Sequence, residues 1–274
     1  MIIFSPAKIN IGLHILEKRP DGFHNIESFF LPIRLTDILE VLPATNLKPG
    51  NFELIESGLK IESAATENLV VKAYTLLAED YNLPAVRIAL HKQIPWGAGL
   101  GGGSSDAASM VMTLNRLFDL NLSGDKLLAY LEQLGSDCPF FTQNRPAFVT
   151  GRGEIMKPVD IKLKNFFLVV VVHDVNINTA RAYSLITPKN PKNQLLKCIP
   201  EDPIKWEALI RNDFEEAIFP DQPRLKQIKG QLYNMGAVYS SMSGSGSAIY
   251  GLFKKEIDLG EHFPDEFIWA DWMA

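Results

Sequence analysis

The chain has 274 residues, of which 46% are hydrophobic, and its formal net charge is −5 at pH 7. Such a length can bury one large core or, as we expect, two cores of ordinary domain size. Its 27 basic residues are outnumbered by 32 acidic ones, so it lacks the basic field that nucleic-acid binding requires. The longest apolar run, FFLVVVV at 166–172, is far shorter than the roughly 20 residues of a membrane helix. We therefore expect a globular protein that binds neither nucleic acid nor a membrane.

The N-terminal segment and the cysteines indicate the compartment. Pro6, Lys8 and Asn10 interrupt the first apolar stretch, so no signal peptide is predicted and we expect a cytoplasmic protein. Cys138 and Cys198 lie far apart, without CxxC or HxxxH spacing. Neither a disulfide framework nor a dedicated metal site is therefore predicted. No interface stripe stands out, and we expect a monomer or a weak homodimer.

The first half of the chain predicts strands followed by helices. Two strands should flank the turn PDG at 20–22, and further strands are expected in TDILEVLP and after Asn51. Apolar spacing predicts a helix over 68–82, capped by Thr66, and alternation predicts a strand over 85–92.

A glycine-rich loop and two helices should follow this strand. The loop opens the segment PWGAGLGGGSSDAASM at 95–110, and apolar spacing beyond it predicts a helix whose N-cap is Ser104 or Ser105. A second helix, capped near Ser123, should end at Gly135. Asp137 is expected to cap the short segment CPFF.

Past Gly151 the pattern predicts a second layer of sheet and helices. Strands are expected in FFLVVVV, AVYSSM, SAIYGLF and EFIWADW, with helices near 179–186, 202–218 and 221–235. This pattern is typical of an α+β fold. The lysine-rich stretch 157–164 is the best candidate junction, which predicts a nucleotide-binding and catalytic domain at 1–157 and a second domain at 158–274.

The glycine loop favours phosphate binding over a plain flexible linker. A helix N-terminus attracts anions, and glycines let phosphate oxygens reach the backbone. Gly97, Gly99 and Gly102 satisfy GxGxxG, but Asp119 is a poor fit for the acidic residue of a dinucleotide fold. A Walker lysine is missing after Gly103, and neither HRD nor DFG occurs. The loop is therefore a phosphate cradle of another type.

Two isolated charges gain meaning beside this loop. Lys8 lies in an apolar N-terminal segment, and Asp137 lies beside Cys138, Pro139 and two phenylalanines. Alone, Lys8 could be a solvated edge lysine and Asp137 a helix cap. Phosphoryl transfer, however, needs anion donors, a carboxylate to receive the hydroxyl proton and a cation near the forming alkoxide.

The segments PAKINIGLHILEKRPDGFH, PWGAGLGGGSSDAA and SSMSGSGSAIYGLF resemble the three motifs of the GHMP kinases. The first, with its DGFH, resembles the branch whose acceptor is a diphosphocytidyl sugar alcohol. The likeness runs nearly end to end and thins between 187 and 237. It implies a two-domain GHMP kinase fold, with an N-terminal domain like domain 2 of ribosomal protein S5 and a ferredoxin-like C-terminal domain.

The resemblance also implies roles for individual residues. It makes Asp137 the catalytic base and Lys8 its assistant. It implies an ATP site with magnesium, although no pair of carboxylates forms an obvious ligand set and only Ser105 or Asp106 suggests a contact with the ion. The implied ATP-binding residues are Pro95, Gly97, Gly99, Leu100, Gly101, Gly102, Gly103, Ser104, Ser105, Asn68 and Lys92.

The acceptor site is implied in the same way. Its residues are Asn10, Phe23, His24, Tyr183, Ser243 and Gly244. His24 would read the cytosine edge, and Phe23 and Tyr183 would stack on the ring, with Phe23 replacing a more usual Tyr. The resemblance implies that Ser243–Ser247 closes over the phosphates or the acceptor's diphosphate, with a plain bulged hairpin as the alternative. GRGE at 151–154 resembles the family without an assigned chemistry.

Three alternatives remain open from the sequence. Another small-molecule kinase of the superfamily would not need DGFH, since it has no cytosine to recognise. A catalytically silent nucleotide-binding module would not need both Lys8 and Asp137. A dinucleotide-dependent oxidoreductase would prefer NAD to ATP.

Overall fold

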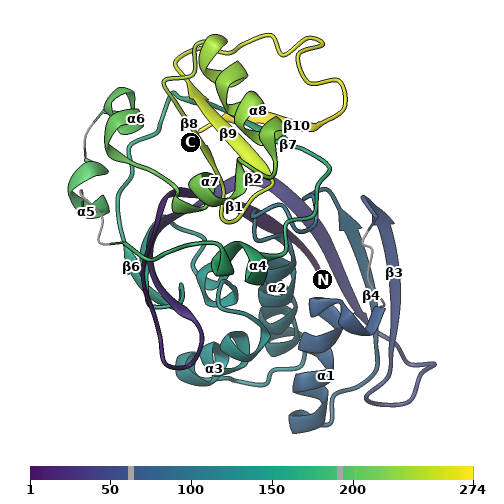
Figure 1. Ribbon diagram of the computed structural model, residues 1–274. Coiled ribbons are helices and arrows are strands. Elements are labelled where there is room, and N and C mark those ends of the chain that lie inside the picture. The colour runs from purple at the N-terminus through teal and green to yellow at the C-terminus, as the bar shows by residue number, and fades with distance from the viewer. Residues whose placement is uncertain (61–64, 190–193, 201, 274) are drawn as a thin grey trace. The chain divides into compact units, whose positions relative to one another are not determined.

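The computed structural model describes residues 1–60, 65–189, 194–200 and 202–273. Figure 1 shows the chain, whose strands are β1 (Ile2–Lys18), β2 (His24–Pro43), β3 (Phe52–Gly58), β4 (Val86–Lys92), β5 (Ala147–Thr150), β6 (Ile155–Pro158), β7 (Phe167–Val172), β8 (Tyr239–Met242), β9 (Ala248–Phe253) and β10 (Phe267–Trp272). The α-helices are α1 (Leu69–Tyr81), α2 (Gly102–Leu117), α3 (Gly124–Leu134), α4 (Thr179–Ser184), α5 (Leu195–Cys198), α6 (Trp206–Leu209), α7 (Asp213–Ile218) and α8 (Pro223–Asn234). Short 3-10 turns are η1 (Ala65–Glu67), η2 (Cys138–Thr142) and η3 (Pro203–Lys205).

The chain divides into two compact units that are discontinuous in sequence. The first unit comprises Met1–Ala7, Arg34–Trp96 and Gly101–Asn144, and the second comprises Lys8–Ile33, Gly97–Leu100 and Arg145–Ala274. Strands β1 and β2 each contribute residues to both units. The predicted domain boundary at 157/158 stays a prediction.

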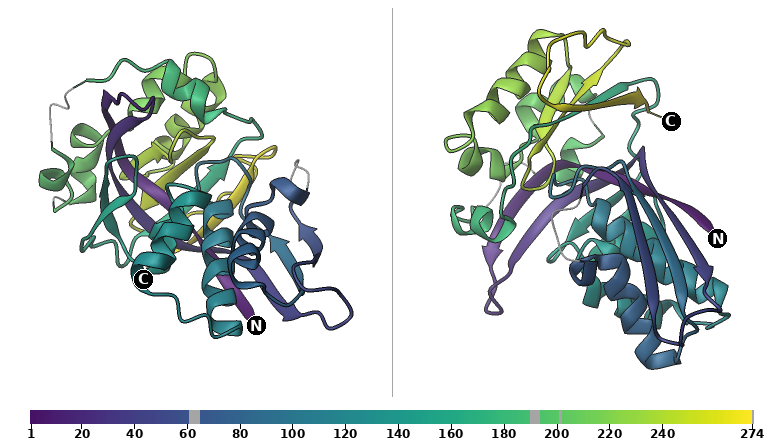
Figure 2. Two further views of the ribbon diagram at one scale, coloured as in Figure 1. Left: turned by 90° about the horizontal axis from the view of Figure 1, so that it is seen from below. Right: turned by 90° about the vertical axis from the view of Figure 1, so that its right-hand side faces the viewer.

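The first unit packs helices on a sheet. Strand β4 pairs parallel with β3 and antiparallel with the later part of β2. Helices α1, α2 and α3 pack against one another and lie on one face of these strands, as the right-hand view of Figure 2 shows. Burial of Tyr74, Leu77 and Leu114 follows from the apolar spacing that predicts the helices.

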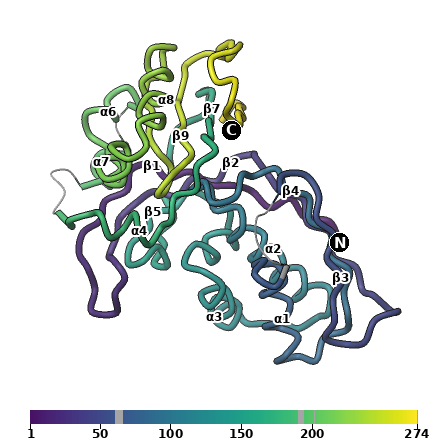
Figure 3. Tube along the Cα trace, turned by 45° about the vertical axis from the view of Figure 1, so that its right-hand side comes forward, coloured from purple at the N-terminus to yellow at the C-terminus, as the bar shows by residue number. Residues whose placement is uncertain are grey.

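The second unit contains an antiparallel sheet of order β10-β7-β9-β8. Helix α8 packs on β8 and β9 and buries Leu225, Ile228 and Leu232. Strand β7 is buried at every position, as its unbroken apolar run predicts. The unit also holds β5 and β6, together with the hairpin of β1 and β2, whose turn is visible in Figure 3. The predicted α+β class and the four predicted C-terminal strands are confirmed.

Two of the predicted helix caps are wrong. Asn68, not Thr66, caps α1, because Thr66 lies in η1 while the Asn68 side chain accepts a hydrogen bond from Val70 N at 3.0 Å. Helix α2 begins at Gly102, and its N-cap is Gly101 with a φ of 71°. Glycine adopts this left-handed conformation readily, so the helix starts before the serines and Ser104 falls in its first turn.

Two further expectations need correction. Asp137 holds the N-cap position of η2, but its side chain makes no capping hydrogen bond. The helix expected over 202–218 is broken into η3, α6 and α7, because Ile210 is extended and Asn212 caps a new helix. Among the described residues, no helix has both the length and the apolar character needed to cross a membrane.

Candidate active site

The glycine loop has a backbone that only glycine adopts easily. Gly97, Gly99 and Gly101 have φ angles of 70°, 77° and 71°, in the left-handed region that disfavours other residues. A Cβ on Gly99 would lie 2.1 Å from the carbonyl oxygen of Ser243. The glycines therefore serve both the turn and a close approach to the third glycine-rich segment.

The loop leads into a long helix that can hold an anion. Helix α2 has 16 residues, and the N–H groups of its first turn lack partners within the helix. Gly102, Gly103 and Ser104 form this turn, Pro95 and Leu100 lie upstream, and Leu100 O accepts a hydrogen bond from Lys8 N at 2.9 Å. Ser105 is buried, and its Oγ has no hydrogen-bond partner.

The segment carrying Asp137 packs beside the start of this helix. Within the first unit, α2 packs against η2. A Cβ on Gly135 would lie 3.3 Å from Cys138 Sγ and 3.8 Å from Ser104 Oγ. Burial raises the pKa of the Cys138 thiol to about 12, although the Ser104 hydroxyl acts in the opposite direction. Asp137, the predicted base, therefore adjoins Cys138, which lies next to Ser104 in the predicted phosphate-binding turn.

A buried ion cluster supports the same turn, and sequence reasoning missed its third member. Lys92 Nζ donates to Asp106 Oδ2 at 2.7 Å and to Asp37 Oδ2, and all three side chains are at most 3% exposed. Asp37 Oδ1 also accepts from the backbone N–H groups of Gln93 and Ile94. The cluster thus ties β2, the segment after β4 and α2 together.

The carboxyl group of Asp106 in this cluster is harder to ionise than an exposed carboxyl group. Burial raises the pKa of Asp106 to about 7, with the Asp37 charge adding to the rise and Lys92 opposing it. The direction follows because two buried carboxylates share one ammonium group. The sequence signal for Asp37 is weak, because TDILEVLP also carries Glu40 in the same apolar alternation. Asn68 has a structural role of its own, since it caps α1 and donates to Glu56.

Lys8 and Asn10 lie in a polar chain inside the second unit. Lys8 Nζ donates to Asn10 Oδ1 at 2.6 Å and lies 4.5 Å from the centre of the Phe30 ring. Asn10 Nδ2 donates to Ser28 Oγ at 2.9 Å, and Asn10 N donates to Ser243 Oγ at 3.2 Å. Lys8 and Asn10 are buried, so the ammonium group is held in one orientation.

The third glycine-rich segment, Ser243–Ser247, meets the glycine loop. Ser243 Oγ donates to Gly99 O at 2.8 Å, and Ala248 N donates to Ala98 O at 3.0 Å. A Cβ on Gly244 would lie 3.3 Å from the Cα of Gly99. The structure thus brings Asn10, Gly99, Ser243 and Gly244 together within the second unit.

An aromatic group follows the β1–β2 turn. The rings of His24 and Tyr183 stack with centroids 4.9 Å apart and planes 12° apart. Burial, and then the charge of Lys18, lower the pKa of His24 below 6.5. Phe23 is 50% exposed, and the Arg152 guanidinium lies 4.6 Å from its ring centre. Base recognition uses a neutral imidazole and an aromatic ring face, and here Arg152 already lies over one face of the Phe23 ring.

Two predicted groupings remain outside what the structure tests. Lys8 belongs to the second unit and Asp137 to the first, so their pairing stays a prediction. The GRGE segment forms a turn between β5 and β6, in which Glu154 accepts a hydrogen bond from Arg152 N at 2.5 Å. Within the described ranges, no cluster of three or more His, Cys, Asp or Glu side chains could hold a metal ion.

Comparison with known proteins places these features in a family. Residues 68–151 match the GHMP kinases N terminal domain, and residues 195–261 match the GHMP kinases C terminal domain. A 4-diphosphocytidyl-2-C-methyl-D-erythritol kinase of Azobacteroides pseudotrichonymphae is 49% identical over 93% of this chain and 94% of its own length. The Parabacteroides distasonis enzyme of that name is 42% identical over 100% of both chains.

A solved structure agrees with these relatives. The crystal structure of a 4-(cytidine 5′-diphospho)-2C-methyl-D-erythritol kinase is 30% identical, with a TM-score of 0.78 and 98% of each chain covered. The two-domain GHMP kinase fold is thereby confirmed. The chain belongs to the GHMP kinases and, within them, to the 4-diphosphocytidyl-2-C-methyl-D-erythritol kinase family.

Proposed function

We propose that this chain transfers the γ-phosphoryl group of ATP to the 2-hydroxyl of 4-diphosphocytidyl-2-C-methyl-D-erythritol, in the non-mevalonate isoprenoid pathway, with Asp137 as base and Lys8 as its assistant. One observation carries the assignment of residues. The first turn of α2, with Ser104, lies against the residue that follows Asp137. A phosphate held at this helix would therefore lie near a carboxylate able to receive the acceptor proton.

The reaction needs few protein groups. ATP binds with its phosphates on the first turn of α2 and on the glycine loop. Asp137 takes the proton of the acceptor hydroxyl, whose oxygen forms a bond to the γ-phosphorus while the bond to the ADP oxygen breaks. Lys8 stabilises the developing negative charge on that oxygen, and the proton on Asp137 then passes to solvent.

Acceptor recognition falls to the aromatic group. The cytosine ring stacks on Phe23 and Tyr183, and the imidazole of His24, whose ring centre lies 4.9 Å from that of Tyr183, reads the cytosine edge. Because the pKa of His24 is lowered, the imidazole is neutral at pH 7 and has one donor and one acceptor for the cytosine edge. Ser243 and Gly244 contact the acceptor's diphosphate.

Magnesium accompanies ATP in this proposal. A magnesium ion bound mostly by phosphates and water needs only one or two protein oxygens. Ser105 Oγ and Asp106 Oδ1 are buried oxygens without a hydrogen-bond partner, so they fit a hard cation and would hold it. When bound, the ion neutralises charge on the transferred phosphoryl group. A cytoplasmic location and a monomer or weak homodimer complete the proposal.

A substrate panel tests the function. ADP formation is measured with the diphosphocytidyl substrate, mevalonate, homoserine and galactose, and we expect turnover only with the first. Equal turnover with another acceptor would reassign the enzyme within its superfamily, and no turnover with any acceptor would indicate a silent nucleotide-binding module. The melting temperature is also measured with ATP and with NAD. A larger rise with NAD than with ATP would favour the dinucleotide-dependent oxidoreductase.

The role of Asp137 has its own test. Asp137→Asn should lower turnover roughly a hundredfold or more, because general base catalysis contributes about 10²–10⁴-fold, while ATP protection against melting persists. Asp125→Asn, on α3, is the matched control and should keep wild-type turnover. Unchanged turnover in Asp137→Asn removes that residue from the role of base.

A further inference from the structure

The segment Ser243–Ser247 is held from its outer side by residues that the motifs do not include. The inner side of this segment contacts Asn10 and Gly99 through Ser243. Its placement relative to Gly99 is tight, because a Cβ at that glycine would lie 2.1 Å from Ser243 O. Whatever fixes the peptide groups before and within the segment therefore fixes the acceptor contacts predicted for Ser243 and Gly244.

Asn212 supplies this support through both N–H donors and the oxygen of its side-chain amide. Its Nδ2 donates to Met242 O at 2.7 Å and to Gly244 O at 2.8 Å, so one amide group spans the two carbonyls that flank Ser243. Its Oδ1 accepts from Phe214 N at 3.0 Å, which caps α7. Asn212 is 3% exposed, and a lost bond here leaves buried groups unpaired.

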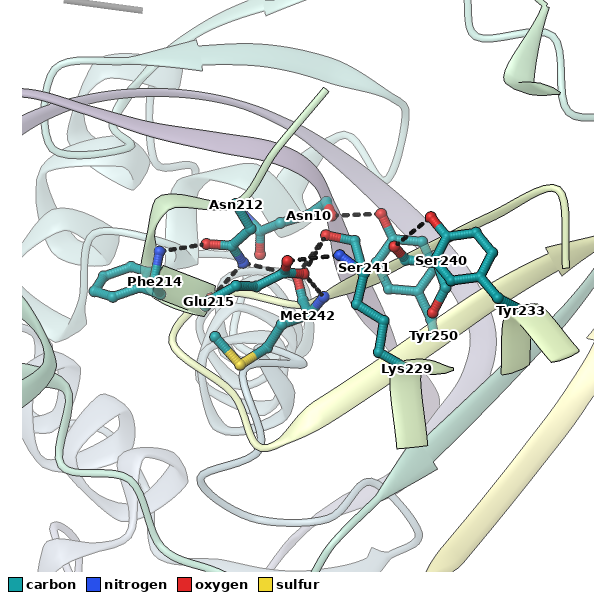
Figure 4. Close-up of polar contacts among 11 residues, drawn as sticks. Asn10, Asn212, Phe214, Glu215, Lys229, Tyr233, Ser240, Ser241, Met242 and Tyr250 are labelled. Atoms are coloured by element: carbon teal, nitrogen blue, oxygen red, sulfur yellow. Dashed lines mark hydrogen bonds and ion pairs between the residues drawn. The ribbon is translucent and has the colours of Figure 1, made fainter. Parts of the chain in front are cut away.

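Glu215, one turn along the chain, holds the same peptide from its other end. Its Oε1 accepts from Met242 N at 2.8 Å and from Ser241 Oγ at 3.1 Å, while Lys229 on α8 donates to its Oε2 at 2.6 Å. Figure 4 shows Asn212 and Glu215 converging on Met242, with Lys229 beside Glu215. Both backbone polar groups of Met242 are thus bound by side chains from one short stretch.

The same stretch is anchored to the strand that carries Lys8 and Asn10. Leu13 N donates to Arg211 O at 2.9 Å, and Leu13 forms an isolated parallel bridge with Asn212. Ile15 N donates to Asp213 Oδ2 at 2.8 Å. Asn212 therefore connects β1, α7 and the Ser243–Ser247 segment within the second unit.

We propose that Asn212 is a positioning residue for the kinase reaction. Its side-chain amide fixes the position of the Ser243–Ser247 segment and thereby orients Ser243 and Gly244 toward the acceptor. This inference rests on the proposed function. Asn212 touches no reacting atom itself, and Glu215 with Lys229 provides the second support. A residue that acted only as the cap of α7 would tolerate Asp, because Asp and Asn cap helices equally well.

The decisive variant is therefore Asn212→Asp, which keeps the capping oxygen and replaces the double donor by an oxygen facing two carbonyls. We expect the KM for the diphosphocytidyl substrate to rise roughly tenfold or more with a smaller change in the KM for ATP, because a lost charged or buried hydrogen bond costs about a factor of ten. Ser123→Asp is the control, since Ser123 caps α3, far along the chain from the segment, and accepts from Lys126 N at 3.3 Å. It should leave both KM values unchanged.

Two further measurements keep the outcome decisive. Asn212→Ser keeps a cap and one donor, so it should show a smaller rise in acceptor KM, and it carries the test if the Asp variant does not fold. Hydrogen exchange at 243–247 should be faster in the Asn212 variants than in the wild type, and this readout needs no substrate. A wild type without kinase activity sinks the proposed function alone, whereas unchanged exchange and unchanged acceptor KM in Asn212→Asp overturn the positioning role.

Discussion

Lys92 Nζ lies 2.7 Å from Asp106 Oδ2, and the same ammonium group contacts the buried carboxylate of Asp37. Removing it by Lys92→Met would leave two buried carboxylates without a cation. We expect the free energy of unfolding in urea to fall by about 3–5 kcal/mol, the usual cost of breaking a buried ion pair from one side.

Lowering the pH should reduce the loss of stability in the Lys92→Met variant. Burial already raises the folded-state pKa of Asp106 and Lys92 opposes that rise, so without Lys92 the deficit in stability relative to wild type is smaller near pH 4 than near pH 8. Arg87→Met is the control, because the Arg87–Glu53 pair is exposed, at 45% and 44% of the two side chains. Its stability should change by no more than about 0.5 kcal/mol.

Gly99→Ala should abolish most of the kinase activity. The new methyl group would lie 2.1 Å from Ser243 O at a φ of 77°, so the glycine loop and the Ser243–Ser247 segment must separate. We expect kcat/KM to fall by roughly two orders of magnitude, which corresponds to about 2.7 kcal/mol. Gly230→Ala offers a matched comparison, since its Cβ meets nothing within 4 Å in α8. It should raise the free energy of unfolding by about 0.5–1 kcal/mol, and a larger kinetic loss there than at Gly99 contradicts the argument.

Protonation of His24 should weaken acceptor binding at acidic pH. Its folded pKa lies below 6.5 because of burial and the Lys18 charge, so its contribution to stability is present above that pH and is lost as pH falls. We expect the acceptor KM to stay constant from neutral pH down to about 6.5 and to rise below it. Lys18→Gln removes one cause, so the rise begins at a higher pH. NMR titration of the His24 ring in both proteins measures the shift directly, and a pKa that falls in Lys18→Gln refutes the assignment.

Phe23 should contribute through its ring face alone. Stacking of a base on an aromatic ring contributes about 1–3 kcal/mol, so Phe23→Leu should raise the acceptor KM roughly tenfold. Phe23→Tyr keeps the ring and should stay within about twofold of wild type. The KM for ATP, measured in the same assays, serves as the internal control. Equal KM values in the Leu and Tyr variants would remove Phe23 from the cytosine site.

Local patterns predicted most of the fold because each depends on neighbours in sequence. The turn at 20–22, the cap at Ser123 and the buried strand FFLVVVV all follow from local spacing and composition. The break in the helix expected over 202–218 has a local cause, because Asn212 caps α7 through Phe214 N, and also a distant one. Asn212 is bound by Leu13 and by the carbonyls of Met242 and Gly244, partners that no window around Asn212 contains.

The candidate site shows the same division. Gly99 and Ser104 stand out because the glycine loop is contiguous, and Lys8 and Asp137 stand out as isolated charges whose roles the family resemblance implies. Asp37 did not stand out, since a single carboxylate in a strand acquires meaning only when Lys92 and Asp106 are known to surround it. Residues that act through another side chain, such as Glu215, leave no mark that sequence reasoning could use.

Segments of the two units alternate along the chain, and this limits how the protein can be cut into fragments that fold. Because Lys8–Ile33 and Gly97–Leu100 group with the C-terminal residues, no single break in the chain separates one unit from the other. Complementary fragments should therefore recover activity only when mixed and refolded together. Since both units depend on contacts far apart in sequence, folding should be slow and should not finish while the chain is still emerging from the ribosome.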